Sequence, residues 1–150
     1  MASFFQFETD FVESLRCIPM QVRYNLDTCG VKLKLDHWNH FSAAQKQVLV
    51  DLPCNTAQEA EAYASQLQAW VTEQTGAPAK TLPIEEQPAW LNNAVLPDDV
   101  VAKATECQLG LSVEQWQALA PLQRFALIKL SRPSHENRNF VPAMTEFGLA

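Results

Sequence analysis

Two stretches of the chain place apolar residues at helical spacing, and both begin with an apolar residue followed by proline. One stretch starts at Ile18-Pro19 and the other at Leu96-Pro97. Proline suits the first position of a helix, because the N–H that it lacks would be unpaired there. Apolar residues then recur at steps of four, four and three, which places them on one helix face. The pattern predicts two amphipathic helices, with inward faces formed by Ile18, Val22, Leu26 and Cys29 and by Leu96, Val100, Ala104 and Cys107.

The two helices belong to a longer self-similarity with an offset of 78 positions, the step from Pro19 to Pro97. Between residues 19 and 52, eight residues are identical to the residue 78 positions later, without a gap, and Trp38 matches Trp116. Average residue usage gives about two identities by chance over such a window. We interpret the match as two copies of one unit of about 35 residues. The alternative is that two unrelated amphipathic helical stretches align this well.

Within each copy a short stretch alternates apolar and polar residues, which is the period of a β-strand. These stretches are residues 31–35 and 109–113, and each is too short to be stable alone. We therefore expect the two stretches to pair with each other across the repeat. A helix is expected after each one, near Asp36 in the first copy and after the capping box of Ser112 and Gln115 in the second.

Further helices are expected from Ser42 in the first copy and from Pro121 in the second. The second of these should be central, because residues 126–130 are apolar nearly all round. Between the copies, Thr56 and Gly76 mark the start and the end of one long helix. Its predicted buried stripe consists of Ala60, Tyr63, Ala64, Leu67, Trp70 and Val71.

Residues 77–96 contain three prolines and a Pro-Ala-Trp-Leu sequence at 88–91, and we interpret them as an ordered linker over the surface. A last short helix is expected between Asn139 and Gly148. Neither half of the chain alone is expected to hold a full core. The predicted fold is therefore mainly α, a single helical domain of residues 1–150. Two pseudo-symmetric helix–short strand–helix repeats (about 18–54 and 96–132) are joined in it by the long helix and the proline-rich linker.

Charge and composition exclude several classes of function. The net charge is −6, whereas a nucleic-acid-binding protein needs clustered Lys and Arg, so nucleic acid is not an expected partner. The four glycines form neither a G-x-G-x-x-G nor a P-loop motif, which excludes the common nucleotide-binding enzymes. No apolar run is long enough to span a bilayer, and acidic residues stand where a signal peptide needs basic ones. We expect a cytoplasmic protein without a membrane segment.

Cysteine and histidine could bind a metal, but neither has the spacing of a known site. His37 and His40 are three positions apart on a predicted helix, whereas the second copy has Gln115 and Ala118 at these places. Both histidines are therefore expected to be solvated, and no metal or other cofactor is predicted. The cysteines have wide, irregular spacings, and we expect reduced, metal-free thiols at Cys17, Cys29, Cys54 and Cys107.

The densest polar stretch runs from Ser131 to Phe140, where eight of the ten residues are polar. It follows the most apolar helix, and nothing in the first copy resembles it. Two interpretations stay open: a solvated turn that caps the last helix, or a polar network that binds an anion or a partner. No nucleophile–base–acid set is visible in the chain, so no catalytic residues and no enzyme activity are predicted.

A series of longer motifs covers almost the whole chain. They are Phe5-Gln-Phe-Glu8, Ser14-Leu-Arg-Cys-Ile-Pro-Met20, Cys29-Gly-Val-Lys-Leu33, Pro88-Ala-Trp-Leu91, Leu122-Gln-Arg-Phe-Ala-Leu-Ile-Lys-Leu-Ser-Arg-Pro133, His135-Glu-Asn137 and Glu146-Phe-Gly-Leu149. Together these segments resemble the nitrate reductase associated protein family. The sequence departs from the family pattern at Ser134, where glycine is expected.

The resemblance implies a role in making the molybdenum-dependent assimilatory nitrate reductase active. The family occurs in cyanobacteria and some other bacteria, beside the genes for that enzyme. We therefore expect an accessory or assembly factor that binds the reductase as its protein partner. The alternative is a small-ligand or metal carrier that handles the molybdenum cofactor, with the cluster from Arg132 to Asn139 holding its phosphate.

All but one of the predicted partner-binding residues lie in that same cluster, because it is polar, breaks the repeat and coincides with a family motif. The planar guanidinium of Arg132 suits a carboxylate or a phosphate. The N-terminal phenylalanines are expected to dock as a hydrophobic lid, formed by Phe4, Phe5, Phe7 and Phe11 near the alternative contact Arg16. The predicted set is Arg132, His135, Glu136, Asn137, Asn139 and Arg16.

Overall fold

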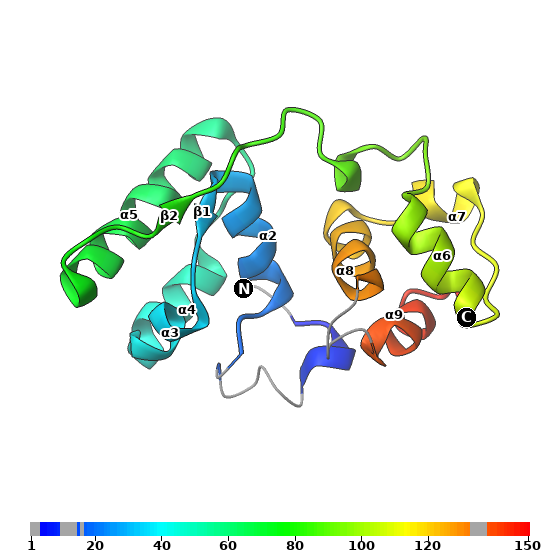
Figure 1. Cartoon of the computed structure of the whole chain (residues 1–150), viewed down its shortest axis with the longest axis horizontal. Coiled ribbons are helices and arrows are strands. Elements are labelled where there is room, and N and C mark those ends of the chain that lie inside the picture. Colours follow the sequence, from blue (N-terminus) through cyan, green and yellow to red (C-terminus); the bar gives the residue numbers. More distant parts are fainter. Residues whose placement is uncertain (1–3, 10–14, 16, 133–137) are drawn as a thin grey trace. The chain divides into compact units, whose positions relative to one another are not determined.

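The computed structural model describes residues 4–9, 15, 17–132 and 138–150. These residues are mainly helical, which confirms the predicted class, and their β-structure is one small two-stranded sheet (Figure 1). Where the chain is described, none of its helices is both long and apolar enough to cross a membrane. The elements are η1 (Gln6–Glu8), α2 (Met20–Cys29), β1 (Val31–Lys32), α3 (Leu35–His40), α4 (Ala43–Asp51), α5 (Ala57–Thr75), β2 (Lys80–Thr81), η2 (Ala89–Leu91), α6 (Asp98–Glu106), α7 (Val113–Ala118), α8 (Pro121–Ser131) and α9 (Phe140–Glu146).

Contacts along the chain divide it into two compact units, and the division falls in the proline-rich linker. The first unit consists of Met1–Phe4 and Glu8–Glu85, and the second of Phe5–Phe7 and Glu86–Ala150. Each unit buries apolar residues of its own. The prediction of a single domain concerns whether the two units fold as one, and it stays a prediction.

In the first unit α2 packs against α5 and α4 (Figure 1). The long helix α5 begins and ends where the sequence predicts. The Thr56 hydroxyl accepts a hydrogen bond from the Glu59 backbone N–H at 3.1 Å, and Gly76 ends the helix with φ 82°. These contacts cap the first turn and stop the helix. The fully buried apolar residues of this core are Val22, Trp38, Leu49, Leu67 and Val71.

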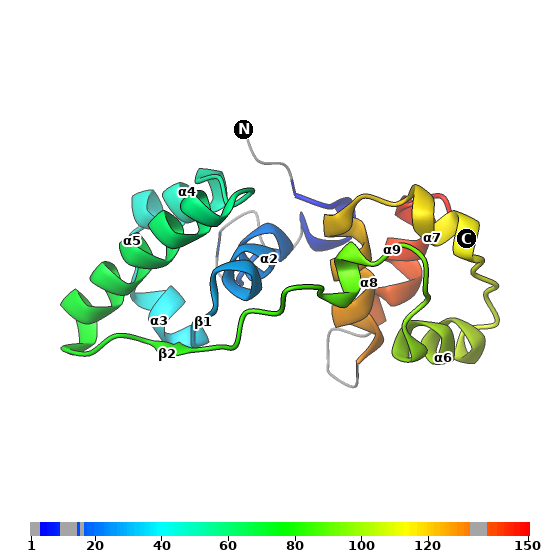
Figure 2. The same cartoon turned by 90° about the horizontal axis from the view of Figure 1, so that it is seen from above.

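In the second unit α8 is the central helix, as its apolar sequence predicts. It packs against α6, α9 and the turn η2 (Figures 1 and 2). It begins at Pro121, the predicted start. A helix that is apolar on all sides is stable in water only when neighbours cover each side. The residues that these neighbours bury are Phe125, Ala126, Leu127, Ile128 and Leu130.

The predicted pairing of the two alternating stretches is wrong. β1 pairs antiparallel with β2 from the linker, with Val31 opposite Thr81 and Lys32 opposite Lys80. Residues 109–112 form no strand. The Leu109 N–H donates instead to the Ala104 carbonyl at 2.8 Å, which caps α6. A ladder needs a neighbouring strand, and the linker supplies one only to the first stretch.

The helices of the two proposed copies start at the same offset. α2 begins at residue 20 and α6 at 98, α3 at 35 and α7 at 113, α4 at 43 and α8 at 121. Each pair is separated by the 78 positions of the sequence match. Two residues with a left-handed backbone conformation at helix ends are also 78 positions apart: Gly30 with φ 77° and Gln108 with φ 61°. These correspondences agree with a duplication, which itself stays a prediction.

Candidate functional site

The structure describes only part of the predicted partner-binding set. Arg132 follows the last residue of α8, and its side chain is exposed. Asn139 is half-buried at the start of α9, where its side chain makes no capping hydrogen bond. Both residues belong to the polar stretch from Ser131 to Phe140 that the sequence singles out, and we call this stretch the polar segment. The other predicted residues, Arg16, His135, Glu136 and Asn137, lie outside the described part of the chain.

The N-terminal phenylalanines do not act as one group. Phe5 and Phe7 stack with ring centroids 5.3 Å apart, and both pack edge-on against Phe147, after α9. The Phe7 N–H also donates to the Glu146 carboxylate at 3.0 Å. Phe4 packs instead against the core of the first unit. The expected lid therefore divides between the two units, and Phe11 lies outside the described residues.

The histidines and cysteines of the described chain do not form a metal centre. Within the described residues, no three His, Cys, Asp or Glu side chains gather around a common point. The His37 ring accepts a hydrogen bond from the Lys34 N–H at 3.2 Å, which caps α3, and the exposed His40 lies beside Asp36 at 3.7 Å. All four cysteines are free thiols; Cys29 and Cys54 are buried, and Cys17 and Cys107 are half-buried.

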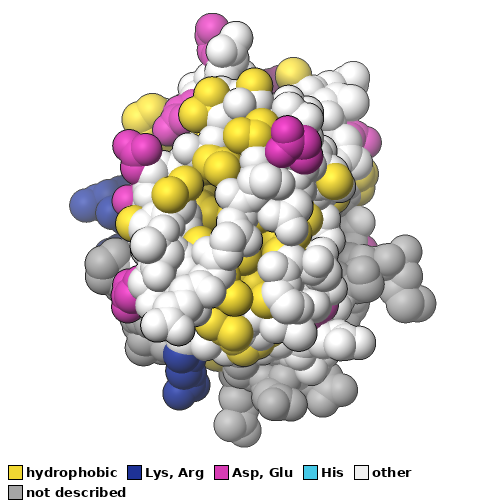
Figure 3. Space-filling model, turned by 90° about the vertical axis from the view of Figure 1, so that its right-hand side faces the viewer, with side chains coloured by type: hydrophobic (Ala, Val, Ile, Leu, Met, Phe, Trp, Pro, Cys, Tyr) yellow, Lys and Arg dark blue, Asp and Glu magenta, His cyan; other side chains and the backbone are white. Residues whose placement is uncertain are grey.

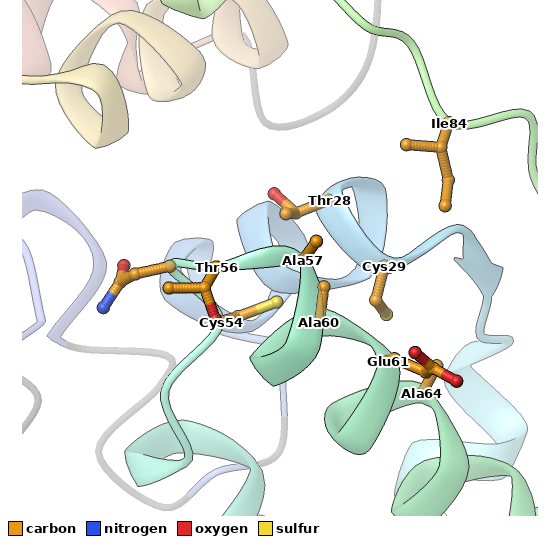
Figure 4. Close-up of a pocket in the computed structure, with 10 residues that line it drawn as sticks. Thr28, Cys29, Cys54, Thr56, Ala57, Ala60, Glu61, Ala64 and Ile84 are labelled. Atoms are coloured by element: carbon orange, nitrogen blue, oxygen red, sulfur yellow. The ribbon is translucent and has the colours of Figure 1, made fainter.

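A pocket of about 520 Å³ opens in the first unit (Figure 4). We call it the α2–α5 pocket, because its walls come from the C-terminal turn of α2 and the N-terminal half of α5. Ile84 of the linker forms part of a third wall. Pockets that hold small molecules have volumes of roughly 300–1,000 Å³. The lining residues are Thr28, Cys29, Cys54, Asn55, Thr56, Ala57, Ala60, Glu61, Ala64 and Ile84.

The two buried thiols of the α2–α5 pocket are held in their neutral form. Burial raises the pKa of Cys29 to about 12, and the neighbouring Cys54 adds to the shift. Burial likewise raises the pKa of Cys54 to about 11, together with the negative charge of Glu59. Each thiol is within 3.7 Å of a backbone carbonyl of α2, Cys29 of Leu26 and Cys54 of Asn25. Neutral thiols of this kind behave as small apolar groups and are poor nucleophiles.

Nearly the whole chain matches one protein family. The family model is described as conserved nitrate reductase-associated protein, and it covers residues 4–147. The chain belongs to this family. The resemblance seen in the sequence is thereby confirmed. Searches among curated proteins and among solved structures found no match.

The match to the nitrate reductase-associated family spans both units, the α2–α5 pocket and the polar segment. The sequence alone identified the polar segment and missed the pocket. The sequence predicts Cys29 on an inward helix face. The residues around Cys54 and Ile84 in the sequence give no indication that these two side chains lie near Cys29. The available signal was the series Ala57, Ala60 and Ala64, small residues at helical spacing that leave room beside α5.

Apolar side chains also reach the surface of the second unit of this family member. Figure 3 shows one face on which apolar side chains lie among backbone and uncharged side chains, with acidic side chains scattered over it and a few basic ones at its edge. The large apolar residues that are most exposed in this unit are Leu91, Val95, Val101 and Val141. Single exposed apolar residues are common on protein surfaces, so these do not define a site.

Proposed function

We propose that this protein is a non-catalytic accessory factor. In this proposal it binds the molybdenum-dependent assimilatory nitrate reductase in the cytoplasm and is needed for that enzyme's activity. The observation that carries the proposal is the family match over residues 4–147, which takes in nearly the whole chain and not a short shared motif. The name of the family speaks only of an association with nitrate reductase. Binding, assembly and the requirement for activity are the proposed part.

The polar segment is the first proposed contact with the reductase. Arg132 is exposed, and a guanidinium pairs readily with a carboxylate through two parallel hydrogen bonds. Asn139 has an amide that α9 does not use as a cap. His135, Glu136 and Asn137 between them, and Arg16 near the N-terminus, complete the proposed set on the basis of the sequence. An exposed guanidinium at a helix end, such as that of Arg132, is well placed to contact another protein surface.

The test is to measure binding and activity in parallel. Purified protein carrying Arg132→Ala should retain its far-UV circular dichroism spectrum, because the side chain is exposed. It should bind purified nitrate reductase about tenfold more weakly, and cells carrying it should have less nitrate reductase activity. Lys32→Ala removes an exposed cation from β1 in the first unit and is the control. A wild-type protein that neither binds the reductase nor affects its activity in a deletion strain would disprove the proposed function.

The α2–α5 pocket gives some support to the alternative of a small-ligand carrier, because its volume suits a small molecule. A carrier of the molybdenum cofactor must hold a phosphate. However, Glu61 lines the pocket, and Glu59 lies close enough to raise the pKa of Cys54. Both carboxylates are negatively charged, as a phosphate is. Like charges repel across a desolvated site. We therefore favour the protein-binding role, and mass spectrometry of the native protein would reveal a bound pterin if the carrier were correct.

A further inference from the structure

We propose that the α2–α5 pocket receives an arginine side chain of the partner protein. This inference rests on the proposed function, and it adds a second contact in the first unit to the polar segment of the second. The partner is identified here by chemistry, a guanidinium on a flexible aliphatic stem. Three features carry the proposal: an apolar wall of the right size, a carboxylate at its edge, and the acidic charge around it.

The wall of the pocket is apolar although several of its side chains carry polar atoms. Ala57, Ala60 and Ala64 present methyl groups from one face of α5, and Ile84 lies across from them (Figure 4). The Thr28 hydroxyl donates to the Tyr24 carbonyl at 2.8 Å, so it is not available to a ligand as a donor. The two thiols are likewise directed to carbonyls of α2. Such a wall suits the three methylene groups of an arginine stem.

Glu61 supplies the charged end of the site. Its side chain is exposed and lines the pocket, next to Ala64 in Figure 4. Among the described residues, no hydrogen bond or ion pair holds this carboxylate. A guanidinium entering along the alanines of α5 can therefore reach Glu61 with its donors while its stem remains on the apolar wall. Arginine–carboxylate pairs are often bidentate, which fixes the geometry as well as the affinity.

The surroundings of the pocket are acidic. Glu61 lines the pocket, and Asp27, Glu59 and Glu85 each lie within two positions of a lining residue in the sequence. Asp27 and Glu59 are close enough to raise the pKa of Cys29 and of Cys54 respectively. A cation is therefore favoured here over a neutral ligand or an anion.

The first turn of α5 also borders the pocket, and a helix N-terminus alone would favour an anion. Here its partial positive charge is offset. The Thr56 hydroxyl accepts from the Glu59 N–H, and the Glu59 carboxylate accepts from the Asn55 N–H at 3.0 Å. The opposite wall is the C-terminal turn of α2, where the macrodipole is negative. Glu61 then adds a full negative charge at the edge of the pocket.

Arginine fits this site better than lysine. A guanidinium is planar and more weakly hydrated than an ammonium, so it loses less on entering an apolar pocket. Its flat face can also lie against Ile84, whose side chain is 63% exposed. Ile84 packs closely against Gly30. A Cβ on Gly30 would lie 2.8 Å from Ile84 Cγ1, so only glycine lets the linker pass this close.

Binding to purified nitrate reductase is the first arm of the test. Glu61→Gln removes the charge, and Ala57→Leu fills the pocket from an exposed position where folding is not at risk. Each variant should weaken binding about tenfold. The matched controls are Glu73→Gln and Ala69→Leu, exposed positions of the same helix outside the pocket, and they should bind like the wild type. If the wild type binds and both pocket variants bind equally well, the inference is wrong and the proposed function stands.

The second arm uses the protein alone, so it does not depend on the reductase. Butylguanidinium is titrated in while the amide resonances of Cys29, Ala60 and Glu61 are followed by NMR. They should shift in the wild type and much less in Glu61→Gln, and butylurea, the uncharged analogue, should leave them unchanged. If butylguanidinium shifts none of them, or butylurea shifts them equally, the pocket does not select a guanidinium and the inference is overturned. If the wild type fails to bind the reductase, the proposed function falls, and with it the partner protein as the source of the arginine.

Discussion

Trp38 and Trp116 are fully buried and each donates its indole N–H to a backbone carbonyl earlier in its own unit. Trp38 Nε1 lies 2.8 Å from the Leu15 carbonyl, 23 positions earlier, and Trp116 Nε1 lies 3.2 Å from the Asn92 carbonyl, 24 positions earlier. In both units a tryptophan on a short helix thus ties down the segment that precedes the first helix. This shared arrangement adds to the helix offsets in favour of a duplicated unit.

Replacing either tryptophan by phenylalanine removes this donor while keeping an aromatic ring. We expect Trp38→Phe and Trp116→Phe each to lower the free energy of unfolding by about 1–3 kcal/mol, because a buried carbonyl is left without its donor. The loss should be larger for Trp38, whose hydrogen bond is shorter and lies in a more buried place. Urea denaturation followed by circular dichroism measures both. A loss at Trp116 that exceeds the loss at Trp38 would contradict this ranking.

Arg124 is the main polar anchor of the second unit. It is 5% exposed, and its guanidinium donates to the carbonyls of Trp90 at 2.7 Å, Leu119 at 2.6 Å and Trp116 at 3.3 Å. Arg124→Met keeps much of the volume but removes every donor, and should destabilise the protein by about 3 kcal/mol. Arg124→Lys should recover only part of this, because one ammonium cannot span carbonyls from three positions. Thermal unfolding of both variants is the measurement, and equal stability of Lys and wild type would refute the anchoring role.

Two constraints favour glycine at position 30: a left-handed backbone conformation and close contacts with the linker. Substitutions at two other glycines allow the two effects to be measured separately. Gly30→Ala places a Cβ at a φ of 77° and within 2.9 Å of the Leu82 carbonyl oxygen. Gly76→Ala meets the same kind of backbone strain at φ 82° but in open space, and Gly110→Ala meets open space without a left-handed φ. We expect almost no effect at Gly110, about 1 kcal/mol at Gly76 and clearly more at Gly30. A chemical denaturation series ranks the three, and a loss at Gly30 no larger than at Gly76 would mean that the linker gives way.

The buried thiols make stability fall in alkaline solution. In the unfolded chain Cys29 and Cys54 ionise near their ordinary pKa of 9.0, whereas in the folded protein they keep their protons up to about 12 and about 11. The unfolded state releases these protons first. The contribution of the neutral thiols to the free energy of unfolding is therefore fully present below about pH 9. It is lost as the pH rises toward the pKa values of the two thiols in the folded protein. Cys54→Ala should reduce the slope of unfolding free energy against pH between about pH 9 and about pH 11.

The half-buried cysteines serve as an internal control for this prediction. Iodoacetamide near neutral pH should alkylate Cys17 and Cys107 before Cys29 and Cys54, because the first two are only half-buried whereas the last two are buried and held neutral. Peptide mass spectrometry reads all four positions in one sample. Equal rates at the four cysteines would show that the buried thiols of Cys29 and Cys54 become accessible on the timescale of the reaction.

The sequence predicted those elements whose ends are determined locally. Pro19 and Pro97 precede α2 and α6, and Gly76 ends α5. Ser42 caps α4, because its hydroxyl accepts a hydrogen bond from the Gln45 N–H at 3.1 Å. Each of these signals acts within one helical turn, so the sequence alone contains it. The same locality explains the outcome at Ser112, which caps α7 as predicted.

The strand partner and the pocket could not be predicted, because both depend on where the linker runs. The Gln68 side chain holds Ala79 through two hydrogen bonds, of 2.7 and 3.0 Å, and so directs the linker past β1. The Leu82 N–H then donates to the Gly30 carbonyl at 2.8 Å, which brings the chain to the α2–α5 pocket. These contacts join residues up to 52 positions apart, and no periodicity in the sequence carries such information. The family motifs indicated the partner class, but they say nothing of a cavity.

The four tryptophans are divided evenly between the units, with Trp38 and Trp70 in the first and Trp90 and Trp116 in the second. Each unit thus contains its own pair of fluorophores. A variant with Trp90→Phe and Trp116→Phe emits only from the first unit, and one with Trp38→Phe and Trp70→Phe only from the second. Each fluorescence melting curve is compared with the melting curve of the same variant followed by circular dichroism. If the two curves coincide for both variants, the units unfold as one cooperative body. Two separate transitions would mean that the chain consists of a pair of independently stable modules.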